Sequence, residues 1–372
     1  MDHSKSVEGE APSPRVYYKV DIVVIGAGQA GLSAAYHLQR MGIRPGDGYV
    51  VLDDESGPGG AWQHRWDSLT LSVVNGIHDL PGMKFTRVTS PDKMKVRANE
   101  AVPEYYGQYE KEFGLPVIRP VRVEEVVESH GRFLIRTNGP NFSSRGLINA
   151  TGSWKTPSCP KYPGWDRFKG RQLHTGEYEN AEEFKGKHVI IVGAGISAIQ
   201  MLDEISRVTT TTWVTRRPPE FRDYEFTPDR GREAVALVDE RVRKGLPPLS
   251  VVSVTGLPLT PAIRDMQRRG VLDRKPMFDE ITEDGVRWEN GEHIKADVIF
   301  WNTGFRASLD HLAPLDLKNE HGGIKMTGRL ATQVAKDPRI HLIGYGPSAS
   351  TIGANRAGRA AAQELIDELG LR

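Results

Sequence analysis

Two glycine-rich runs are the stretches of this chain with the clearest potential for binding chemistry. The run GAGQAG occupies residues 26–31, and the run GAGISA occupies residues 193–198. Glycine lets the backbone turn sharply and leaves its N–H groups uncovered, so that they can approach a phosphate closely. Each run is therefore a candidate site for the pyrophosphate of a dinucleotide.

The sequence around both runs favours this interpretation. An apolar stretch precedes each run, at residues 20–25 and 188–192, and a helical pattern follows it. A strand, a glycine turn and a helix in this order begin a dinucleotide-binding βαβ unit, with the helix N-terminus facing the phosphates. We expect the following residues to contact the cofactors: Gly26, Gly28 and Gly31 in the first unit, and Gly193, Gly195, Ser197 and Ala198 in the second.

The next predicted strand of each unit ends in a different charge. In the first unit, YVVLDDE places Asp53 22 residues beyond Gly31, where a carboxylate accepts hydrogen bonds from ribose hydroxyls. In the second unit, TTTTWVTRR ends in Arg216 and Arg217, and a guanidinium binds the ribose 2′-phosphate that an acid repels. The first loop therefore suits a nucleotide with a free ribose diol, and the second suits NADPH. The alternative is that both arginines are only solvated charges at the end of a strand.

Two other apolar stretches end in Thr-Gly and favour a flavin as the first cofactor. GLINATGSW contains Thr151 and Gly152, and DVIFWNTGF contains Thr303 and Gly304. Small residues at a strand end allow the chain to pass close to a cofactor. From residue 340 onward, another strand, glycine loop and helix are expected to return the chain to the first domain.

The composition excludes several classes of function. Lysine and arginine total 49 against 48 acidic residues, which gives no reason to expect a nucleic-acid or anionic-membrane partner. The mean hydropathy is −0.45, and no apolar run approaches the length of a membrane span. Residues 1–15 are expected to be a disordered tail without a signal peptide, and the cytoplasm is the expected compartment. The eleven histidines and one cysteine form no metal-binding pattern.

The stretch FKGRQLHTGEY stands just ahead of the second loop and carries a resemblance to a known family. Class B flavin-dependent monooxygenases, which include flavin-containing and Baeyer–Villiger monooxygenases, carry a Phe-x-Gly-x-x-x-His-x-x-x-aromatic pattern before their NADPH loop. The similarity runs from about residue 20 to the C-terminus and is greatest to compact bacterial members. The matching residues here are Phe168, Gly170, His174 and Tyr178, together with Gly59, Gly60 and Trp62 of a Gly-Gly-x-Trp segment beside the flavin.

The resemblance implies an α/β fold of two nested Rossmann-like dinucleotide-binding domains. We expect an FAD-binding domain of residues 16–160 and 296–372, interrupted by an NADPH-binding domain of residues 161–295. Residues 218–286 are rich in charge and proline and are expected to form a helical and loop insertion, as a lid or a substrate wall. The enzyme would reduce FAD with NADPH, form a flavin peroxide with O₂, and transfer one oxygen atom to a small-molecule substrate.

The resemblance also implies roles for particular residues. His174 would couple the domains and retain the cofactor. A tyrosine at the last position of the pattern, Tyr178, resembles the family branch that oxygenates nitrogen and sulfur more than the Baeyer–Villiger branch. Family members often hold the oxygenated flavin with an asparagine, and the candidates here are Ser72, at the corresponding place, and Asn75 nearby. Because the reactive flavin must be kept dry, candidate walls are Trp62, Trp66 and Leu71.

Two rival functions share both nucleotide loops. A flavoprotein disulfide reductase needs a pair of cysteines, whereas Cys159 is alone. A flavin- and NADPH-binding redox sensor would have the same motifs without oxygen insertion. The preferred function is oxygenation of an amine, a thioether or a ketone, by an enzyme that would be a homodimer if it follows the commonest oligomeric state.

Overall fold

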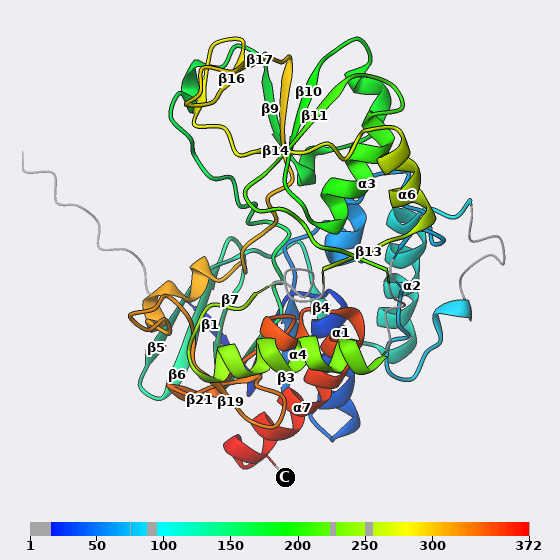
Figure 1. The fold of residues 1–372 in the computed structure, drawn as a ribbon. Helices are drawn as coiled ribbons and strands as arrows, with labels where there is room; N and C mark the ends of the chain where they lie inside the picture. The colour runs from blue at the N-terminus through cyan, green and yellow to red at the C-terminus, as the bar shows by residue number, and fades with distance from the viewer. Residues whose placement is uncertain (1–15, 75, 88–94, 224–227, 250–255, 372) are drawn as a thin grey trace, which may run out of the picture.

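The computed structural model describes residues 16–74, 76–87, 95–223, 228–249 and 256–371. Figure 1 shows two lobes joined by a narrow connection, with the N-terminal and C-terminal parts of the chain in the lower lobe. The central part of the chain forms the upper lobe. Both lobes are built on a largely parallel sheet, so the expected α/β class is confirmed.

The lower lobe contains a seven-stranded sheet in the order β19-β20-β21-β8-β2-β3-β4. Its neighbouring strands β8, β2 and β3 are buried along their whole length, as expected for parallel strands covered on both faces. The strands are β2 (Ile22–Ile25), β3 (Tyr49–Leu52), β4 (Val117–Ile118), β8 (Gly146–Asn149), β19 (Met326–Thr327), β20 (Gln333–Val334) and β21 (Asp337–Leu342).

Successive residues of β2 pack into different layers. Ile22 and Val24 join the core that contains the helices α1 (Gln29–Arg40), α2 (Ala98–Phe113) and α7 (Thr351–Leu369). Val23 and Ile25 point to the other face, which a four-stranded sheet covers. That sheet has the order β1-β7-β6-β5 and consists of β1 (Tyr17–Lys19), β5 (Val123–Ser129), β6 (Arg132–Thr137) and β7 (Asn141–Ser144).

The C-terminal helix α7 packs along α1 in the lower lobe. A Cβ atom on Gly358 of α7 would lie only 2.7 Å from Ser33 Oγ and 2.8 Å from Ala34 N. The absence of a side chain therefore allows the two helices to approach closely. The Ser33 hydroxyl also donates a hydrogen bond to the Asn355 carbonyl, at 3.0 Å. This contact fixes the N-terminal part of α7 beside the first glycine loop.

The upper lobe contains a five-stranded parallel sheet in the order β14-β11-β10-β18-β9. The helices α3 (Ile196–Ile205) and α6 (Pro261–Arg268) cover one face, and a three-stranded antiparallel sheet contributes to the core on the other. The parallel strands are β9 (Arg171–His174), β10 (Val189–Val192), β11 (Thr211–Thr215), β14 (Lys275–Pro276) and β18 (Val298–Trp301). The antiparallel strands are β15 (Glu280–Ile281), β16 (Gly285–Arg287) and β17 (His293–Lys295).

The position of β18 corrects one expected domain boundary. The sequence interpretation returned the chain to the first domain at residue 296. In the structure Val298–Trp301 lies between β10 and β9 of the upper sheet and pairs with both. The chain therefore leaves the upper lobe only after Trp301, because this strand completes the centre of the second sheet.

The expected insertion at residues 218–286 does not form a single body. Helix α4 (Pro228–Arg243) lies on the lower lobe, where Val242 is part of the core and Arg243 donates to the Gly328 carbonyl at 3.0 Å. Strand β14 and Phe278 belong instead to the upper lobe. The remaining short elements are β12 (Phe221–Arg222), β13 (Leu257–Pro258), η1 (Gly60–His64), η2 (Phe85–Arg87), η3 (Trp165–Arg167), η4 (Thr175–Glu177), η5 (Ala181–Phe184), η6 (Asp310–Leu315) and η7 (Gly346–Ser348). No helix in the described part of the chain is long and apolar enough to cross a membrane.

Candidate functional site

The three glycines of the first loop have two different structural roles. Gly26 has φ +99°, and a Cβ there would lie 2.6 Å from the Ala150 carbonyl oxygen. A Cβ on Gly31 would collide with the carbonyl oxygen of Gly26. By contrast, a Cβ on Gly28 would meet no heavy atom within 4 Å. Internal packing thus requires the outer glycines, whereas the middle glycine borders the open space that a pyrophosphate needs.

The second loop repeats this arrangement with one substitution. Gly193 has φ +132°, and a Cβ there would collide with the carbonyl oxygen of Asn302. A Cβ on Gly195 would have nothing within 4 Å, so the middle position is again open. Ala198 is fully buried, which shows that this helix and strand leave room for one methyl group. The indole N–H of Trp213 donates to the Gly193 carbonyl at 2.7 Å, a support that the sequence interpretation missed.

The acid at the end of β3 is already paired within the first lobe. Asp53 is 5% exposed, and its Oδ2 accepts from Arg119 Nε at 3.0 Å. Arg119 also binds Glu110 through both terminal nitrogens, at 2.7 and 2.9 Å. Burial raises the pKa of the Asp53 carboxyl, and the Arg119 charge opposes this rise. Asp53 Oδ1 has only a long contact of 3.4 Å with the Ala27 N–H and remains the oxygen facing the loop.

The basic corner at the end of β11 has the opposite character. The Gly193 N–H donates to the Val214 carbonyl at 2.9 Å, so Arg216 and Arg217 follow a strand that is bonded directly to the second loop. Both side chains are exposed, and neither has an ion pair among the described residues. Arg274 joins the same corner because its Nε donates to Thr215 Oγ1 at 2.8 Å. This third arginine was missed because it comes from a segment 58 residues farther along the chain than Arg216.

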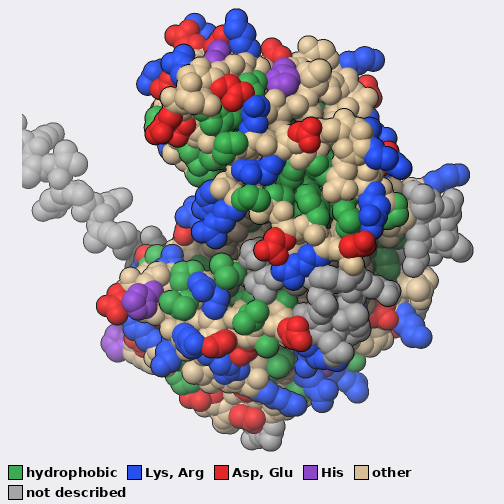
Figure 2. All heavy atoms as spheres, viewed as in Figure 1, with side chains coloured by type: hydrophobic (Ala, Val, Ile, Leu, Met, Phe, Trp, Pro, Cys, Tyr) green, Lys and Arg blue, Asp and Glu red, His purple; other side chains and the backbone are tan. Residues whose placement is uncertain are grey.

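The two chain crossings between the lobes pair as an antiparallel ribbon. Ser158 N–H donates to the Gly304 carbonyl at 2.9 Å, and Ser308 N–H donates to the Gly152 carbonyl at 2.9 Å. The side chains of the two predicted threonines take part as well: Thr151 Oγ1 donates to the Ser308 carbonyl at 2.6 Å, and Thr303 Oγ1 to the Ser158 carbonyl. The structure therefore brings both Thr-Gly pairs into one hinge. Figure 2 shows the surface constricted between the lobes at this level.

Aromatic residues line the ribbon on the side of the upper lobe. Trp154 and Phe305, which follow the two Thr-Gly pairs, stack with ring centroids 4.7 Å apart. His174 meets the Phe305 ring edge-on at 4.8 Å. An aromatic residue soon after each Thr-Gly was a sequence signal for this pair. The ribbon borders a cavity of about 390 Å³ lined by His64, Trp154, Lys155, Pro157, His174, Gly176, Glu177 and Phe305.

We call Phe168, Gly170, His174 and Tyr178, which precede the second loop, the fingerprint residues. Their contacts in the structure show why each residue type is needed. A Cβ on Gly170 would collide with the Asp297 carbonyl oxygen and lie 2.6 Å from the Phe168 ring. Glycine is therefore needed where Phe168 folds over the chain beside β18. Four residues later, His174 closes the turn of η4, since its backbone N–H donates to Glu177 Oε2 at 2.7 Å.

The hydrogen bonds of His174 indicate which ring nitrogen carries the proton. Its Nδ1 accepts a long hydrogen bond from the Gly176 N–H at 3.4 Å, so Nε2 carries the proton and donates to the Gly304 carbonyl at 2.9 Å. Burial lowers the pKa of this imidazole, and the bond to Gly304 partly offsets the effect. His174 is therefore neutral near pH 7 and tethers the second crossing to β9.

The last fingerprint residue forms a second contact between the lobes. The buried Tyr178 hydroxyl donates to Glu204 Oε2 of α3 at 2.7 Å, and Ser68 Oγ contacts both oxygens of the same carboxylate at 2.8 Å. Trp66 packs edge-on against the Tyr178 ring, at 6.1 Å between centroids. We call Ser68, Glu204, Tyr178 and Trp66 the interlobe clasp. Sequence patterns gave no indication of Glu204, which occupies an ordinary helical position.

Trp62 lies in a segment that closes the first loop. A Cβ on Gly60 would be 3.1 Å from the Gly28 Cα atom, so Gly60 passes directly against the loop. Trp62 lies near the buried Tyr106 hydroxyl, which donates to Gln29 Oε1 at 2.5 Å. Gln29 then donates to Asn355 Oδ1 of α7 at 2.8 Å. This polar chain, also missed from sequence, fixes the Trp62 segment relative to the loop.

Of the two predicted catalytic residues, the structure describes only Ser72. Ser72 is exposed, and its hydroxyl shares a 2.7 Å hydrogen bond with Thr70 Oγ1. Asn75 lies outside the described residues. Leu71 and Trp66 are buried, whereas Trp62 is half-buried. The identity of the group that stabilises the reactive flavin stays a prediction.

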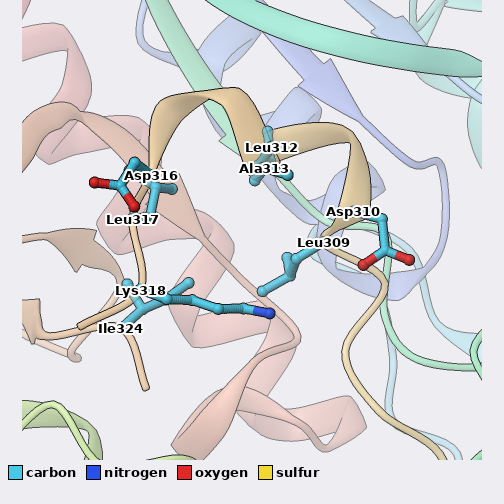
Figure 3. A pocket seen from close by; sticks show the side chains of 8 residues that line it. All are labelled: Leu309, Asp310, Leu312, Ala313, Asp316, Leu317, Lys318 and Ile324. Carbon is cyan, nitrogen blue, oxygen red and sulfur yellow. The ribbon is translucent and has the colours of Figure 1, made fainter. Parts of the chain in front are cut away.

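A smaller cavity, of about 130 Å³, lies in the lower lobe around η6 (Figure 3). Its walls are mainly apolar, with Asp310, Asp316 and Lys318 among the lining side chains. Leu309, Leu312, Ala313, Leu317 and Ile324 complete it. None of these residues belongs to a glycine loop, to the ribbon or to the clasp. We therefore assign this cavity no part in the candidate site.

Comparisons with known proteins agree with this geometry. The family model described as pyridine nucleotide-disulphide oxidoreductase matches residues 23–241. The structure of a flavin-containing monooxygenase from Stenotrophomonas maltophilia superimposes with a TM-score of 0.77 and 34% identity, covering 94% of this chain and 99% of that one. The indole-3-pyruvate monooxygenase YUCCA1 of Oryza sativa subsp. japonica is 27% identical over 77% of both chains. The oxidoreductase CzcO of Bacillus subtilis is 31% identical, but the match spans only 51% of this chain and 53% of that relative.

The two glycine-loop units, which we call the two cradles, agree with the fingerprint residues and with these relatives. Together they lead to one assignment. The chain belongs to the pyridine nucleotide-disulphide oxidoreductase family and, within it, to the class B flavin-dependent monooxygenases. It is an oxygen-inserting flavoenzyme that uses FAD and NADPH and acts with O₂ on a small molecule. The disulfide-reductase alternative is disfavoured by chemistry, because the chain's one cysteine, Cys159, is an exposed free thiol.

Proposed function

We propose that this enzyme takes electrons from NADPH in preference to NADH and transfers one atom of O₂ to an amine or a thioether. The observation that carries the proposal is the contrast between the two cradles. One cradle adjoins a buried acid, and the other adjoins an exposed cluster of arginines. When bound, FAD supplies the activation of oxygen and NADPH supplies the electrons, because no side chain performs either task.

The lower lobe is proposed to hold FAD. The open space beside Gly28 and the N–H groups at the start of α1 suit its pyrophosphate, and Asp53 Oδ1 suits the ribose hydroxyls. Residues 16–160 and those from about 302 to 372 would form this domain. The proposed contacts are Gly26, Gly28, Gly31, Asp53, Gly60, Trp62, Thr151 and Gly152.

The upper lobe is proposed to hold NADPH. The open space beside Gly195 and the start of α3 suit the second pyrophosphate. Arg216 and Arg217 stand at the position where a ribose 2′-phosphate binds in such a unit, and neither has an ion pair with a described residue, which supports this role for their planar guanidinium groups. The proposed contacts are Gly193, Gly195, Ser197, Ala198, Arg216 and Arg217, with His174, Thr303 and Gly304 at the hinge.

The hinge and the clasp are proposed to set the distance between the cofactors. The neutral His174 keeps its proton on Nε2 and holds the Gly304 carbonyl, so it acts as a tether instead of a proton donor. Trp62, Trp66 and Leu71 would exclude water from the reaction space, which an oxygenating flavin requires. These residues act by position and not by acid–base chemistry.

The substrate class is proposed from the fingerprint and not from a pocket. Tyr178 at its last position is similar to the branch of the family that oxygenates nitrogen and sulfur. A ketone is the second candidate, because the YUCCA1 relative is named for indole-3-pyruvate, a carbonyl compound. The two candidates differ in their product: an N- or S-oxide retains the carbon skeleton, whereas a ketone oxidation changes it.

Isotope labelling tests the proposed function. The holoenzyme would be incubated with NADPH, ¹⁸O₂ and a panel of amines, thioethers and ketones, and the products analysed by mass spectrometry. We expect one ¹⁸O atom in an N- or S-oxide, together with one NADPH consumed per product molecule. Consumption of NADPH with only hydrogen peroxide as the product across the whole panel would contradict the proposal.

A further inference from the structure

Arg65 lies at the junction of the lobes and has no acidic partner among the residues that the structure describes. Its guanidinium carbon lies 4.1 Å from the ring centroid of Trp154 and 5.7 Å from that of Trp62. Trp62 follows Gly60, which touches the first glycine loop, and Trp154 follows Gly152 at the start of the ribbon. The charge is therefore held between the two segments that leave the first cradle.

The hydrogen-bonding capacity of Arg65 is unused. Its Nε is buried and has no partner, and neither terminal nitrogen makes a hydrogen bond or an ion pair with any residue that the structure describes. Neighbouring acids are engaged elsewhere: Asp67 pairs with Arg97 at 3.1 Å, and Glu55 pairs with Lys155 at 2.9 Å. A buried donor without a partner is unfavourable, so a ligand that supplies an acceptor would stabilise this arrangement.

Two other cations packed on aromatic rings provide an internal reference. Arg339 lies 4.7 Å from the Phe133 ring centroid and pairs with Asp337 at 2.7 Å. Lys275 lies 5.7 Å from the Trp288 centroid and pairs with Glu292 at 2.6 Å. In both cases a carboxylate completes the site. Arg65 has the same aromatic packing, on two rings, but lacks the carboxylate.

The electrostatics agree with this difference. Burial alone lowers the pKa of the Arg65 guanidinium to about 10, whereas the Asp337 hydrogen bond raises the pKa of Arg339. Stacking on tryptophan offsets part of the desolvation cost but supplies no hydrogen-bond acceptor. The missing component of the site is therefore an anion.

We infer that Arg65 binds the negatively charged group of a ligand, a phosphate or a carboxylate, through its planar fork. A guanidinium presents parallel N–H donors that match either group. The source is a phosphate of FAD, a phosphate of NADP⁺ or a carboxylate of the substrate. The inference rests on the proposed function for the identity of these sources, but it concerns binding and not oxygen transfer.

Three binding measurements on the holoenzyme test the inference with Arg65→Met, which keeps the aliphatic stem and removes the charge. FAD affinity would be measured from fluorescence of the released cofactor on dilution, and NADP⁺ and benzoate affinity by calorimetry. We expect one dissociation constant to rise at least about tenfold, as for the loss of a charged hydrogen bond. The constant that rises identifies the source. The matched control is Arg339→Met, which also removes a ring-stacked guanidinium and should change all three by less than about twofold.

Unchanged affinity for all three ligands in Arg65→Met would overturn the inference and leave a purely packing role. If that variant does not fold, Arg65→Lys decides the matter, because it retains the charge but loses the fork. We expect Arg65→Lys to weaken the same ligand about threefold or more. Wild-type affinity of Arg65→Lys for all three ligands would also overturn the inference. Because no readout is an activity, oxygenation can fail or succeed independently.

Discussion

The two dinucleotide units have the same order of strand, glycine turn and helix, but the charged residues that follow them differ in sign and in burial. In the lower lobe, Asp53 is buried and held by Arg119, which is held in turn by Glu110. In the upper lobe, Arg216 and Arg217 are exposed and unpaired among the described residues. The acid of the first unit therefore already has a charge partner within the protein, whereas the arginines of the second unit have none among the described residues.

Under the proposed function, this contrast explains how one chain would separate two similar cofactors. A buried, internally paired acid suits a nucleotide that stays bound, because its position depends on the folded core and little on solvent. Exposed arginines suit a phosphorylated nucleotide that binds and leaves, since solvated charges attract it without a large desolvation cost. The first loop is also packed more tightly than the second. There is no room for a methyl group at Gly31, whereas the second unit holds Ala198 at the same position.

The largest expected effect comes from filling the tighter loop. Gly31→Ala would drive a Cβ into the Gly26 carbonyl oxygen and destabilise the lower lobe by about 3 kcal/mol or more, as severe overpacking does. The matched change in the second loop, Ala198→Gly, should cost only about 1 kcal/mol. Thermal unfolding and bound-flavin absorbance check both variants. Wild-type flavin content and melting temperature in Gly31→Ala would show that the loops are equally tolerant.

The next effect concerns the basic corner. Arg→Ala at whichever of Arg216 and Arg217 binds the 2′-phosphate should raise the dissociation constant for NADPH by about 10- to 150-fold, through loss of a charged hydrogen bond. Binding of NADH should change little, because it lacks that phosphate. Steady-state KM values for both coenzymes measure the split. Equal losses for NADH and NADPH, or no loss in either variant, would remove the assignment.

We expect the free energy of unfolding of the lower lobe to depend on pH. His311 of η6 contacts Asn149 Oδ1 at 2.7 Å, and burial lowers its pKa to about 4 from an ordinary value of 6.5. Between these values the unfolded state binds more protons, so stability falls as the pH drops from about 6.5 toward 4 and is constant above. The full loss over this range is about 3 kcal/mol, of which about 2 kcal/mol falls between pH 6.5 and pH 5. His37 and His341 act in the same direction.

Urea unfolding between pH 7 and pH 5, followed by flavin release, measures this dependence. His311→Gln can retain the hydrogen bond to Asn149 without titrating, so its stability should fall less steeply with acid. A pH slope identical to that of the wild type would show that His311 does not control the lower lobe. Greater stability at pH 5 than at pH 7 would contradict the sign of the effect.

The smallest expected effect concerns the interlobe clasp. Ser68→Ala removes the hydroxyl that bonds Glu204 and leaves Tyr178 in place, so the lobes should be held less firmly. We expect NADP⁺ affinity to fall about fivefold, as for one neutral-to-charged hydrogen bond at an exposed position. The exposed pair of Glu240 with Lys244 offers a control, since Glu240→Gln should change nothing. An identical NADP⁺ affinity and radius of gyration in Ser68→Ala would dissociate the clasp from cofactor binding.

Local patterns predicted the elements well, because each glycine loop is a strand, turn and helix contiguous in sequence. The Thr-Gly ends at Gly152 and Gly304 were also recognisable, although nothing local showed that they pair. The return boundary was placed at residue 296, too early, because β18 is apolar like any buried strand and its sheet is decided by distant partners.

The missed residues share one property: their partners are remote in sequence. Arg119 meets Asp53 across 66 residues, and Glu204 meets Ser68 across 136 residues. Periodicity and motif spacing carry no information about such pairs. A buried acid without a local partner was the one available signal for Arg119, since a buried carboxylate requires a donor. Ser72 shows the converse, because a position matched by counting lies on the surface.

Hydrogen exchange on the FAD-loaded enzyme, with and without NADP⁺, tests the central claim of two different cradles most directly. NADP⁺ should slow exchange in peptides covering residues 193–198 and 214–217 and leave residues 26–31 unchanged. Protection of residues 26–31 by NADP⁺, or no protection of residues 193–198, would contradict the assignment of the two loops to different nucleotides.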